Sequence, residues 1–171
     1  RESFAAEMND ALDATVAAVA SSAAAVEGSD VVITATNASE PVFDGDLLED
    51  GAHVTAMGQY DADVREIDAE TVERATYVPD LRARTETDAG AFIQAVEEGV
   101  IGEDHVHAEL GEVVAGVEPG RTSDDEITLF DSGGTAIETV AAAHMLYERA
   151  VERDLGEPLE FAPASQALTG K

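Results

Sequence analysis

The chain has 171 residues, 44% of them hydrophobic, which is enough to bury one core of ordinary size. It carries 37 Asp and Glu against 9 Lys and Arg, so its net charge is −28. Such a surface repels phosphates and anionic lipid headgroups, which excludes nucleic acids and membranes as partners. The lack of cysteine excludes disulfides and thiolate catalysis and fits an intracellular protein.

The acidic residues are spread between apolar runs rather than gathered in blocks. This pattern indicates a solvated surface on a folded core, not a disordered acidic tail. Repulsion within such a surface costs stability at low salt and is screened within about 10 Å at roughly 0.1 M ionic strength. We therefore expect a cytoplasm of high salt concentration, such as that of a halophilic archaeon.

One alanine-rich helix is predicted over residues 3–27, where apolar side chains recur at helical spacing before a glycine. β-branched runs follow at 30–36, 53–58 and 76–80, and a helical stretch at 69–74 precedes the last of them. Short continuous apolar runs are typical of parallel strands that are covered on both faces. The first half of the chain therefore predicts three parallel strands.

The second half repeats the alternation of helix and strand. Helices are predicted at 89–98 and 105–115, a fourth strand at 126–131 and a long helix at 135–153. This alternation predicts an α/β fold with a doubly wound parallel sheet, whose ligands bind beyond the carboxyl ends of the strands. We place this domain at residues 1–155 and expect residues 156–171 to form an extended C-terminal arm or tail.

Small polar turns follow three of the predicted strands: TNAS at 36–39, GQYD at 58–61 and DSGG at 131–134. The carboxyl ends of parallel strands share one edge of the sheet, so the three turns are expected to gather along a single crevice. Small polar residues suit a loop that lies against a flat cofactor.

Several stretches carry a resemblance to a known family. They are SDVVITAT at 29–36, EPVF at 40–43, HVTAMG at 53–58, REID at 65–68 and, most specifically, AELGEV at 108–113 leading to GRTSDDEIT at 120–128. In order over roughly residues 1 to 155, the chain resembles the ornithine cyclodeaminase and mu-crystallin family of NAD(P)-binding proteins. The resemblance implies an incomplete Rossmann-type sheet, because the family's first strands and its Gly-x-Gly-x-x-Gly turn are not in this sequence.

The resemblance implies that the three turns hold NAD or NADP. It assigns contacts to Thr36, Asn37, Met57, Gly58, Ser132 and Gly133. Each also has an ordinary interpretation, as a strand end, as a glycine that only turns the chain, or, for Ser132 or Thr135, as a helix N-cap. Arg1 and Ser3 fall just after the family's second strand, where they would hold an adenosine 2′-phosphate, or else have no role.

For catalysis, the resemblance leaves two alternatives. Cyclodeaminases carry an Asp soon after the glycine of the second turn, and that position is Tyr60 here, with Asp61 and Asp63 nearby as candidate catalytic carboxylates or as ordinary surface residues. The other use of the scaffold is amino-acid oxidation or imine reduction, as in the family's alanine dehydrogenases and ketimine reductases, which needs hydride geometry and a proton donor. We expect this second chemistry.

The resemblance also implies parts beyond this sequence. A preceding domain would supply the cations for the carboxylate of an amino or imino acid substrate and would form a homodimer. In the standard strand order, the missing strands would separate the first strand present here from the other three, so the chain alone would be unstable or an excerpt. The alternatives are a mu-crystallin-like protein that binds NADP and a small ligand without turnover, and a truncated copy without function.

The histidines do not predict a metal site, because His105 and His107 are two residues apart and would face different sides of a helix. His144 lies on an apolar helical stripe and is predicted to be a core or interface residue. Thr122 or Ser123 is expected to cap a turn while Arg121 pairs with an acidic side chain.

Overall fold

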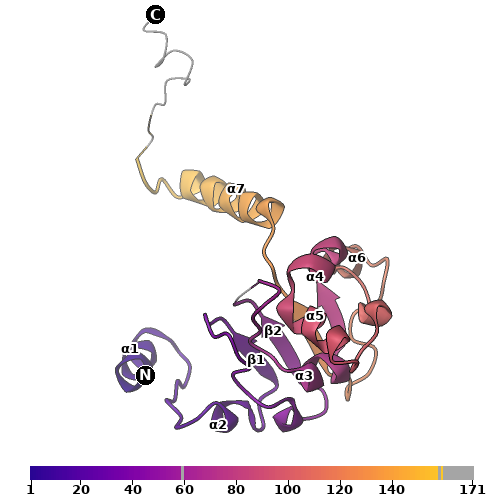
Figure 1. Ribbon diagram of the computed structural model, residues 1–171. Helices are drawn as coiled ribbons and strands as arrows, with labels where there is room; N and C mark the ends of the chain where they lie inside the picture. The colour runs from indigo at the N-terminus through magenta and orange to yellow at the C-terminus, as the bar shows by residue number, and fades with distance from the viewer. Residues whose placement is uncertain (59, 158, 160–171) are drawn as a thin grey trace, which may run out of the picture. The chain divides into compact units, whose positions relative to one another are not determined.

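The computed structural model describes residues 1–58, 60–157 and 159 (Figure 1). Residues 1–134 form one compact unit and residues 135–171 a second. The boundary predicted after residue 155 stays a prediction, and most of the predicted arm at 156–171 lies outside the described residues. No helix in the described ranges combines the length and the apolar character that crossing a membrane requires.

The first unit is built on four parallel strands. They are β1 (Val31–Thr34), β2 (His53–Ala56), β3 (Thr76–Pro79) and β4 (Thr128–Asp131), in the spatial order β1-β2-β4-β3. All four fall in predicted runs, and the parallel α/β fold is confirmed. The expected separation of the first strand is wrong: β1 pairs directly with β2, with Val32 beside Val54. Strands that follow one another in the chain usually lie side by side, and these two do.

One face of the sheet carries the core. Val54, Tyr77 and Leu129 alternate with more exposed residues along their strands, which turns every second side chain toward this face. The helices α3 (Ala69–Arg74) and α5 (Gly90–Glu97) contribute Val72 and Phe92 to the same core, and the Phe92 and Tyr77 rings lie 5.3 Å apart between centroids. These contacts fix the strands that carry the predicted turns.

The opposite face is only partly covered. The helix α6 (Leu110–Val114) and the loop with Arg121 flank it over β3 and β4. At β1 it is open, and Val31 and Ile33 remain 56% and 64% exposed. The expectation that every strand is covered on both faces is therefore wrong for β1, because the helices packed into the core lie on the other side of the sheet.

The predicted helix at 3–27 is two shorter helices, α1 (Glu2–Ala11) and α2 (Ala23–Val26). Between them Asn9 binds the backbone of Val16 twice: its Nδ2 donates to the carbonyl oxygen at 2.7 Å and its Oδ1 accepts from the amide at 2.8 Å. This pairing gives the Val16 amide and carbonyl oxygen partners outside a helix, as Asn side chains that bind the backbone can do. A helical spacing of apolar residues was not sufficient here.

The middle of the chain also differs from the prediction in detail. A helix that was not predicted, α4 (Arg82–Asp88), precedes α5, and short 3₁₀ turns, η1 (Gly45–Leu47) and η2 (Glu103–His105), occur in the connections. The helix predicted at 105–115 is reduced to α6, because Val106 forms a β-bridge with Tyr77. The helix predicted at 69–74 is confirmed as α3, where the Asp68 side chain accepts from Thr71 N at 2.8 Å.

The second unit holds the long helix α7 (Ala136–Glu152), as predicted. Thr135 is its N-cap and forms a capping box with Glu138, so the cap expected from Ser132 or Thr135 is Thr135. No residue of α7 is buried, and His144 is exposed beside Glu148, with 3.5 Å between Nε2 and Oε1. A core role for His144 is therefore wrong for this chain.

Candidate functional site

The three predicted turns lie along one edge of the sheet. Thr34, Ala56 and Asp131, the last residues of β1, β2 and β4, are paired neighbours. The chain continues past them in register: Met57 N donates to Thr34 O at 2.9 Å, and Ser132 N donates to Ala56 O at 2.8 Å. The expected gathering of the turns is therefore met, while their contact with a cofactor stays a prediction.

The predicted contact residues differ in exposure. Thr36, Asn37 and Met57 are exposed, and Ser132 and Gly133 are half-buried. Thr36 Oγ1 accepts from Ala38 N at 3.0 Å, which closes the turn after β1. The edge thus presents hydroxyl and amide groups beside one apolar side chain, a mixture suited to a nucleotide.

Glu66, in the connection between β2 and α3, is buried behind the turns. Its Oε1 accepts a hydrogen bond from Thr36 N at 2.5 Å. A Cβ at Gly58 would lie 2.0 Å from the Glu66 carboxyl carbon. Gly58 therefore makes room for the Glu66 side chain, a reason for a glycine here that the turn pattern alone did not reveal.

Tyr60 fills the space between the turns after β2 and β4. Its ring lies where a Cβ at Gly133 would be, 2.6 Å from the nearest ring carbon, so Gly133 must lack a side chain. The Arg84 guanidinium lies 4.9 Å from the ring centroid, and its NH1 donates to Gly134 O at 2.8 Å. Burial raises the pKa of Tyr60 to about 12. Tyr60 is therefore a neutral aromatic wall of the site.

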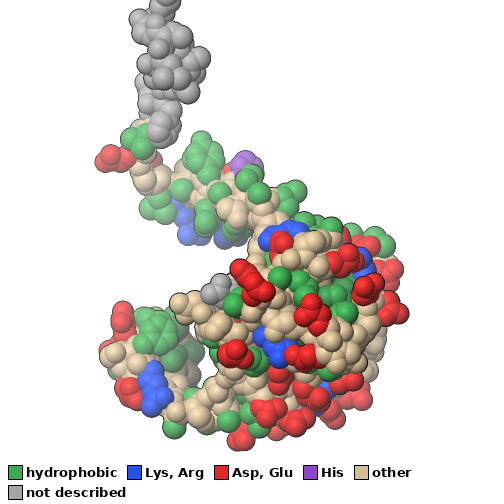
Figure 2. All heavy atoms as spheres, viewed as in Figure 1, with side chains coloured by type: hydrophobic (Ala, Val, Ile, Leu, Met, Phe, Trp, Pro, Cys, Tyr) green, Lys and Arg blue, Asp and Glu red, His purple; other side chains and the backbone are tan. Residues whose placement is uncertain are grey.

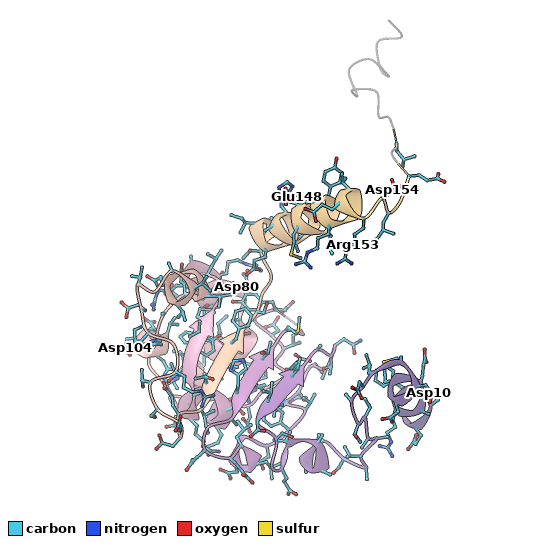
Figure 3. All side chains as sticks on the ribbon, turned by 180° about the vertical axis from the view of Figure 1, so that it is seen from behind. Asp10, Asp80, Asp104, Glu148, Arg153 and Asp154 are labelled. Carbon is cyan, nitrogen blue, oxygen red and sulfur yellow. The ribbon has the colours of Figure 1, made fainter. Side chains whose placement is uncertain are left out.

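Two buried aspartates stand at the ends of β3 and β4. Asp131 accepts a hydrogen bond from the hydroxyl of the fully buried Tyr77. Burial raises the pKa of Asp131 to about 6; the Tyr77 hydrogen bond opposes this rise, and the Asp80 and Glu66 carboxylates add to it. Asp80, which is labelled in Figure 3, accepts from Gly134 N at 2.7 Å through its Oδ2 and so ties the turn after β4 to β3.

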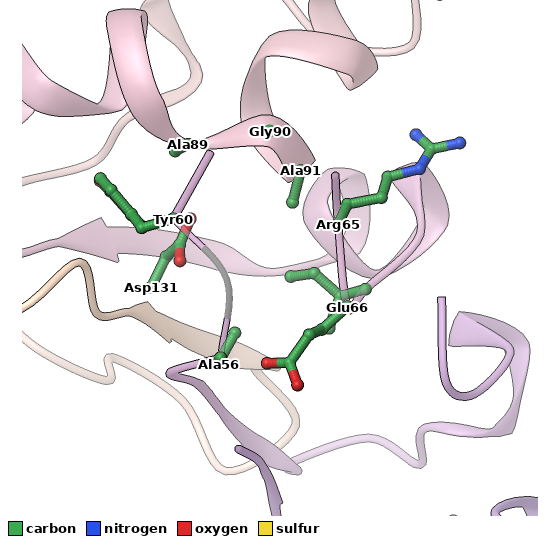
Figure 4. A pocket seen from close by; sticks show the side chains of 10 residues that line it. Ala56, Tyr60, Arg65, Glu66, Ala89, Gly90, Ala91 and Asp131 are labelled. Carbon is green, nitrogen blue, oxygen red and sulfur yellow. The ribbon is translucent and has the colours of Figure 1, made fainter. Parts of the chain in front are cut away.

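Tyr60, Glu66 and Asp131 are among the residues that line a small pocket (Figure 4). Its volume of about 10 Å³ is enough for a single water molecule. It is lined by Ala56, Gly58, Tyr60, Arg65, Glu66, Ile67, Ala89, Gly90, Ala91 and Asp131. The pocket is too small for a substrate, and the buried Glu66, Ile67 and Ala89 line it, so it is part of the support of the site.

The proposed catalytic aspartates lie on the surface loop after β2. Asp61 and Asp63 are both exposed, and Asp61 Oδ1 accepts from Asp63 N at 3.0 Å, which stabilises the loop. Arg1 and Ser3 lie at the start of α1, where the Arg1 guanidinium bonds Glu2 Oε1 at 3.0 Å and Ala20 O at 3.3 Å. Asp61 is itself the last residue of the turn at 58–61, whereas the Arg1 hydrogen bonds run to Glu2 and Ala20 and not to the turns.

Sequence reasoning missed the buried carboxylates as a group. Asp131 was noted only as a member of its turn, and Glu66 only as part of the resemblance. The available signal was an acidic residue placed at, or just after, the end of an apolar strand, which applies to Asp80 and Asp131. A carboxylate reaching a strand end from a distant loop, as Glu66 does, leaves no such signal.

The loop at 120–128 is structural. The Arg121 guanidinium donates to the carbonyl oxygens of Glu126 and Ala52 and to Thr128 Oγ1, so the expected pairing with an acidic side chain is wrong. Thr122 donates both its amide and its hydroxyl to the Glu126 carboxylate. Within the described part of the chain, no group of three or more His, Asp or Glu side chains is arranged to hold a metal ion.

The chain is similar to several characterised enzymes. Alanine dehydrogenase of Archaeoglobus fulgidus is 40% identical over 132 residues, which are 77% of this chain and 41% of that protein. A Δ1-pyrroline-2-carboxylate reductase of Bacillus cereus is 38% identical over 138 residues, 80% of this chain and 42% of the relative. The chain thus spans about two-fifths of the length of these relatives.

Solved structures agree with this grouping. Thermococcus litoralis Δ1-pyrroline-2-carboxylate reductase in complex with NADH and L-proline matches with a TM-score of 0.84 and 42% identity, over 92% of this chain and 49% of that one. An archaeal alanine dehydrogenase dimer with bound NAD matches with a TM-score of 0.79 and 35% identity, over 94% and 49%. The family model described as "Ornithine cyclodeaminase/mu-crystallin family" matches residues 1–154. The chain therefore belongs to the ornithine cyclodeaminase/mu-crystallin family.

Proposed function

We propose that this chain is the dinucleotide-binding part of an NAD(P)-dependent oxidoreductase that acts on amino or imino acids. The observation that carries the proposal is the alignment of three small polar turns at the carboxyl ends of β1, β2 and β4. This is the edge at which open parallel sheets bind their ligands. Relatives that are reductases and dehydrogenases of this substrate class support it.

The residues at this edge fit a nicotinamide dinucleotide. Thr34 Oγ1 is a buried hydroxyl oxygen without a hydrogen-bond partner among the described residues, at the point where β1 opens into the exposed turn with Thr36 and Asn37. Met57 offers an apolar surface, and Ser132 on the turn after β4 offers a hydroxyl, which lies 3.5 Å from Asp80 Oδ2. When bound, the nicotinamide supplies the hydride equivalent of the reaction. The turns would orient the cofactor, and the half-buried Tyr60 ring would exclude water from one side.

Reduction of an imine or oxidation of an amine is favoured over cyclodeamination. The position at which cyclodeaminases carry their aspartate is Tyr60, and a phenol whose pKa is raised by burial to about 12 cannot act as a general base near neutral pH. Asp61 and Asp63 remain the proposed carboxylates for water activation if the protein is a cyclodeaminase. Imine reduction uses neither.

The whole protein's partners are part of the proposal. The substrate is a small amino or imino acid held by cations outside this chain, and the protein is a homodimer through an N-terminal domain, in line with the dimeric alanine dehydrogenase neighbour. The Asp and Glu side chains over the visible surface (Figure 2), with the net charge of −28, support a cytoplasm rich in salt, such as that of a halophilic archaeon.

The test is spectroscopic. Full-length protein in concentrated KCl is mixed with NADH or NADPH and either Δ1-pyrroline-2-carboxylate or pyruvate with ammonia, and absorbance at the nicotinamide band is followed. We expect loss of absorbance with one of the two substrates. Cofactor binding without turnover would support the mu-crystallin-like alternative instead, and a protein that binds neither cofactor would overturn the proposal.

A further inference from the structure

The Glu66 carboxylate joins two of the three turns from behind. It is only 4% exposed, and it reaches from the connection after β2 to the backbone amide of Thr36 beyond β1. On its other side it occupies the volume that any side chain at position 58 would need. The same group therefore fixes the turn after β1 by a hydrogen bond and the turn after β2 by packing.

The charge of Glu66 is not explained by stability. No ion pair of Glu66 is formed within the described ranges, since the neighbouring Arg65 points away from it (Figure 4) and binds Glu98 at 2.8 Å. The second carboxylate oxygen, Oε2, is buried without a hydrogen-bond partner among the described residues. A buried carboxylate that is half satisfied costs free energy, and a neutral acceptor would bind Thr36 N more cheaply.

The length of its side chain does explain why a glutamate occupies position 66. Thr36 N lies two residues past Thr34, the last residue of β1, and the Glu66 side chain that meets it occupies the position where a Cβ of Gly58 would be. A side chain of this length, approaching from behind, leaves the exposed face of the turns open for a ligand.

We infer that Glu66 is a positioning residue for the dinucleotide, acting through Thr36 N and Gly58 to hold the turns after β1 and β2 at the spacing that the cofactor requires. This rests on the proposed function. It also names a specific requirement: the acceptor must have the length of a glutamate, whereas its charge is dispensable.

Three variants of the full-length protein separate length from charge. Glu66→Gln keeps the length and one acceptor oxygen and removes the charge. Glu66→Asp keeps the charge but is one methylene too short for Thr36 N. Glu98→Gln is the matched control, because it removes the same charge from an exposed carboxylate whose ion pair is with the Arg65 side chain and not with the turns.

The first measurement needs no cofactor. Hydrogen exchange of the peptide covering residues 33–39 is followed in the apo protein in concentrated KCl. We expect the Thr36 amide to exchange about tenfold faster in Glu66→Asp, the effect of one lost hydrogen bond to a charged group, and within about threefold of wild type in Glu66→Gln and Glu98→Gln.

The second measurement is NADH affinity by fluorescence titration, with steady-state kinetics beside it. Glu66→Asp is expected to raise the dissociation constant for NADH about tenfold while the KM of the imino or amino acid changes less than about twofold. Glu66→Gln should bind NADH within about threefold of wild type. A general structural defect would instead weaken the binding of NADH and of the substrate together, or would reduce the amount of folded protein.

Each other outcome overturns the inference. An equal loss of NADH affinity in Glu66→Gln and Glu66→Asp would show that the length of the side chain is not the requirement. Faster exchange of the Thr36 amide with unchanged NADH affinity would show that the position of this turn does not affect cofactor binding. If Glu66→Asp does not fold, Gly58→Ala takes its place, because the added methyl group displaces the same carboxylate. Gly58→Ala must then show the faster Thr36 exchange and the weaker NADH binding expected of Glu66→Asp. If the wild-type protein and the Glu98→Gln variant both bind neither NADH nor NADPH, the proposed function itself is wrong.

Discussion

The two ends of strand β4 carry acidic residues in opposite surroundings. Before the strand, the Glu126 carboxylate accepts from Thr122 N at 2.5 Å, from Thr122 Oγ1 at 3.0 Å and from Ser123 N at 3.3 Å, and it also accepts from the Thr76 hydroxyl. At its other end Asp131 is buried and accepts from the Tyr77 hydroxyl. The hydrogen bonds, led by that from Thr122 N, lower the pKa of Glu126 to about 2, whereas burial raises the pKa of Asp131 to about 6.

The difference separates the stabilising end of the sheet from the end that is available to a ligand. A carboxylate that accepts several hydrogen bonds is stabilised in its charged form and contributes to folding. A buried carboxyl group with few partners is costly, and such groups are concentrated at functional sites. Asp131, the buried carboxyl group, lies at the carboxyl edge of the sheet, where the turns are expected to bind the cofactor.

The largest expected effect is at the amino end. Glu126→Ala removes the acceptor of all of these hydrogen bonds and should lower the free energy of unfolding by about 3 kcal/mol at neutral pH, measured by denaturant titration in concentrated KCl. Because the folded-state pKa lies below the ordinary value of 4.5, this contribution is present above about pH 4.5 and is lost as pH falls toward 2. A variant as stable as wild type would contradict the stabilising role of this end; Glu126→Gln, which keeps one acceptor oxygen, should lose less.

The next effect is at the carboxyl end and has the opposite sign. The folded-state pKa of Asp131, about 6, lies above its ordinary value of 3.8, so the contribution of this group to stability is full below pH 3.8 and falls as pH rises through 6, by on the order of 2 to 3 kcal/mol. Asp131→Asn keeps an acceptor for Tyr77 and should remove this fall, which makes the variant more stable than wild type at pH 7.5. Parallel pH profiles of the two proteins would contradict the burial of a charge there.

The spacing of apolar residues was enough to predict the strands, α3 and α7. Each of these elements is one continuous segment of the chain that keeps the spacing typical of its secondary structure. The spacing was not enough at residues 12–22, between α1 and α2, where the Asn9 side chain binds the Val16 amide and carbonyl oxygen in place of helical partners. The turns at Thr36, Gly58 and Ser132 could be placed on one edge because parallel strands share an edge. Glu66 could not, because its role depends on a crossing between segments 30 residues apart that no sequence period encodes.

A smaller effect tests the partner of Asp131. Tyr77→Phe removes the hydroxyl that donates to Asp131 while leaving the ring in its contact with Phe92, and should cost about 1 to 1.5 kcal/mol at pH 7.5. The cost should shrink when Asp131 is already Asn, because the lost bond then involves a neutral acceptor. Additive effects in this double-mutant cycle would show that the two groups are not coupled.

The smallest effect is expected from the exposed carboxylates of the same edge. Asp61→Asn keeps the acceptor for Asp63 N, and Asp63→Asn changes a side chain that faces solvent, so each should alter the free energy of unfolding by less than about 0.5 kcal/mol and the rate of imine reduction by less than about twofold. Steady-state rates of NADH oxidation in concentrated KCl measure the second quantity. A fall of about a hundredfold in either variant, the size of a lost general acid or base, would mean that an exposed carboxylate takes part in the chemistry, as water activation in a cyclodeaminase would require.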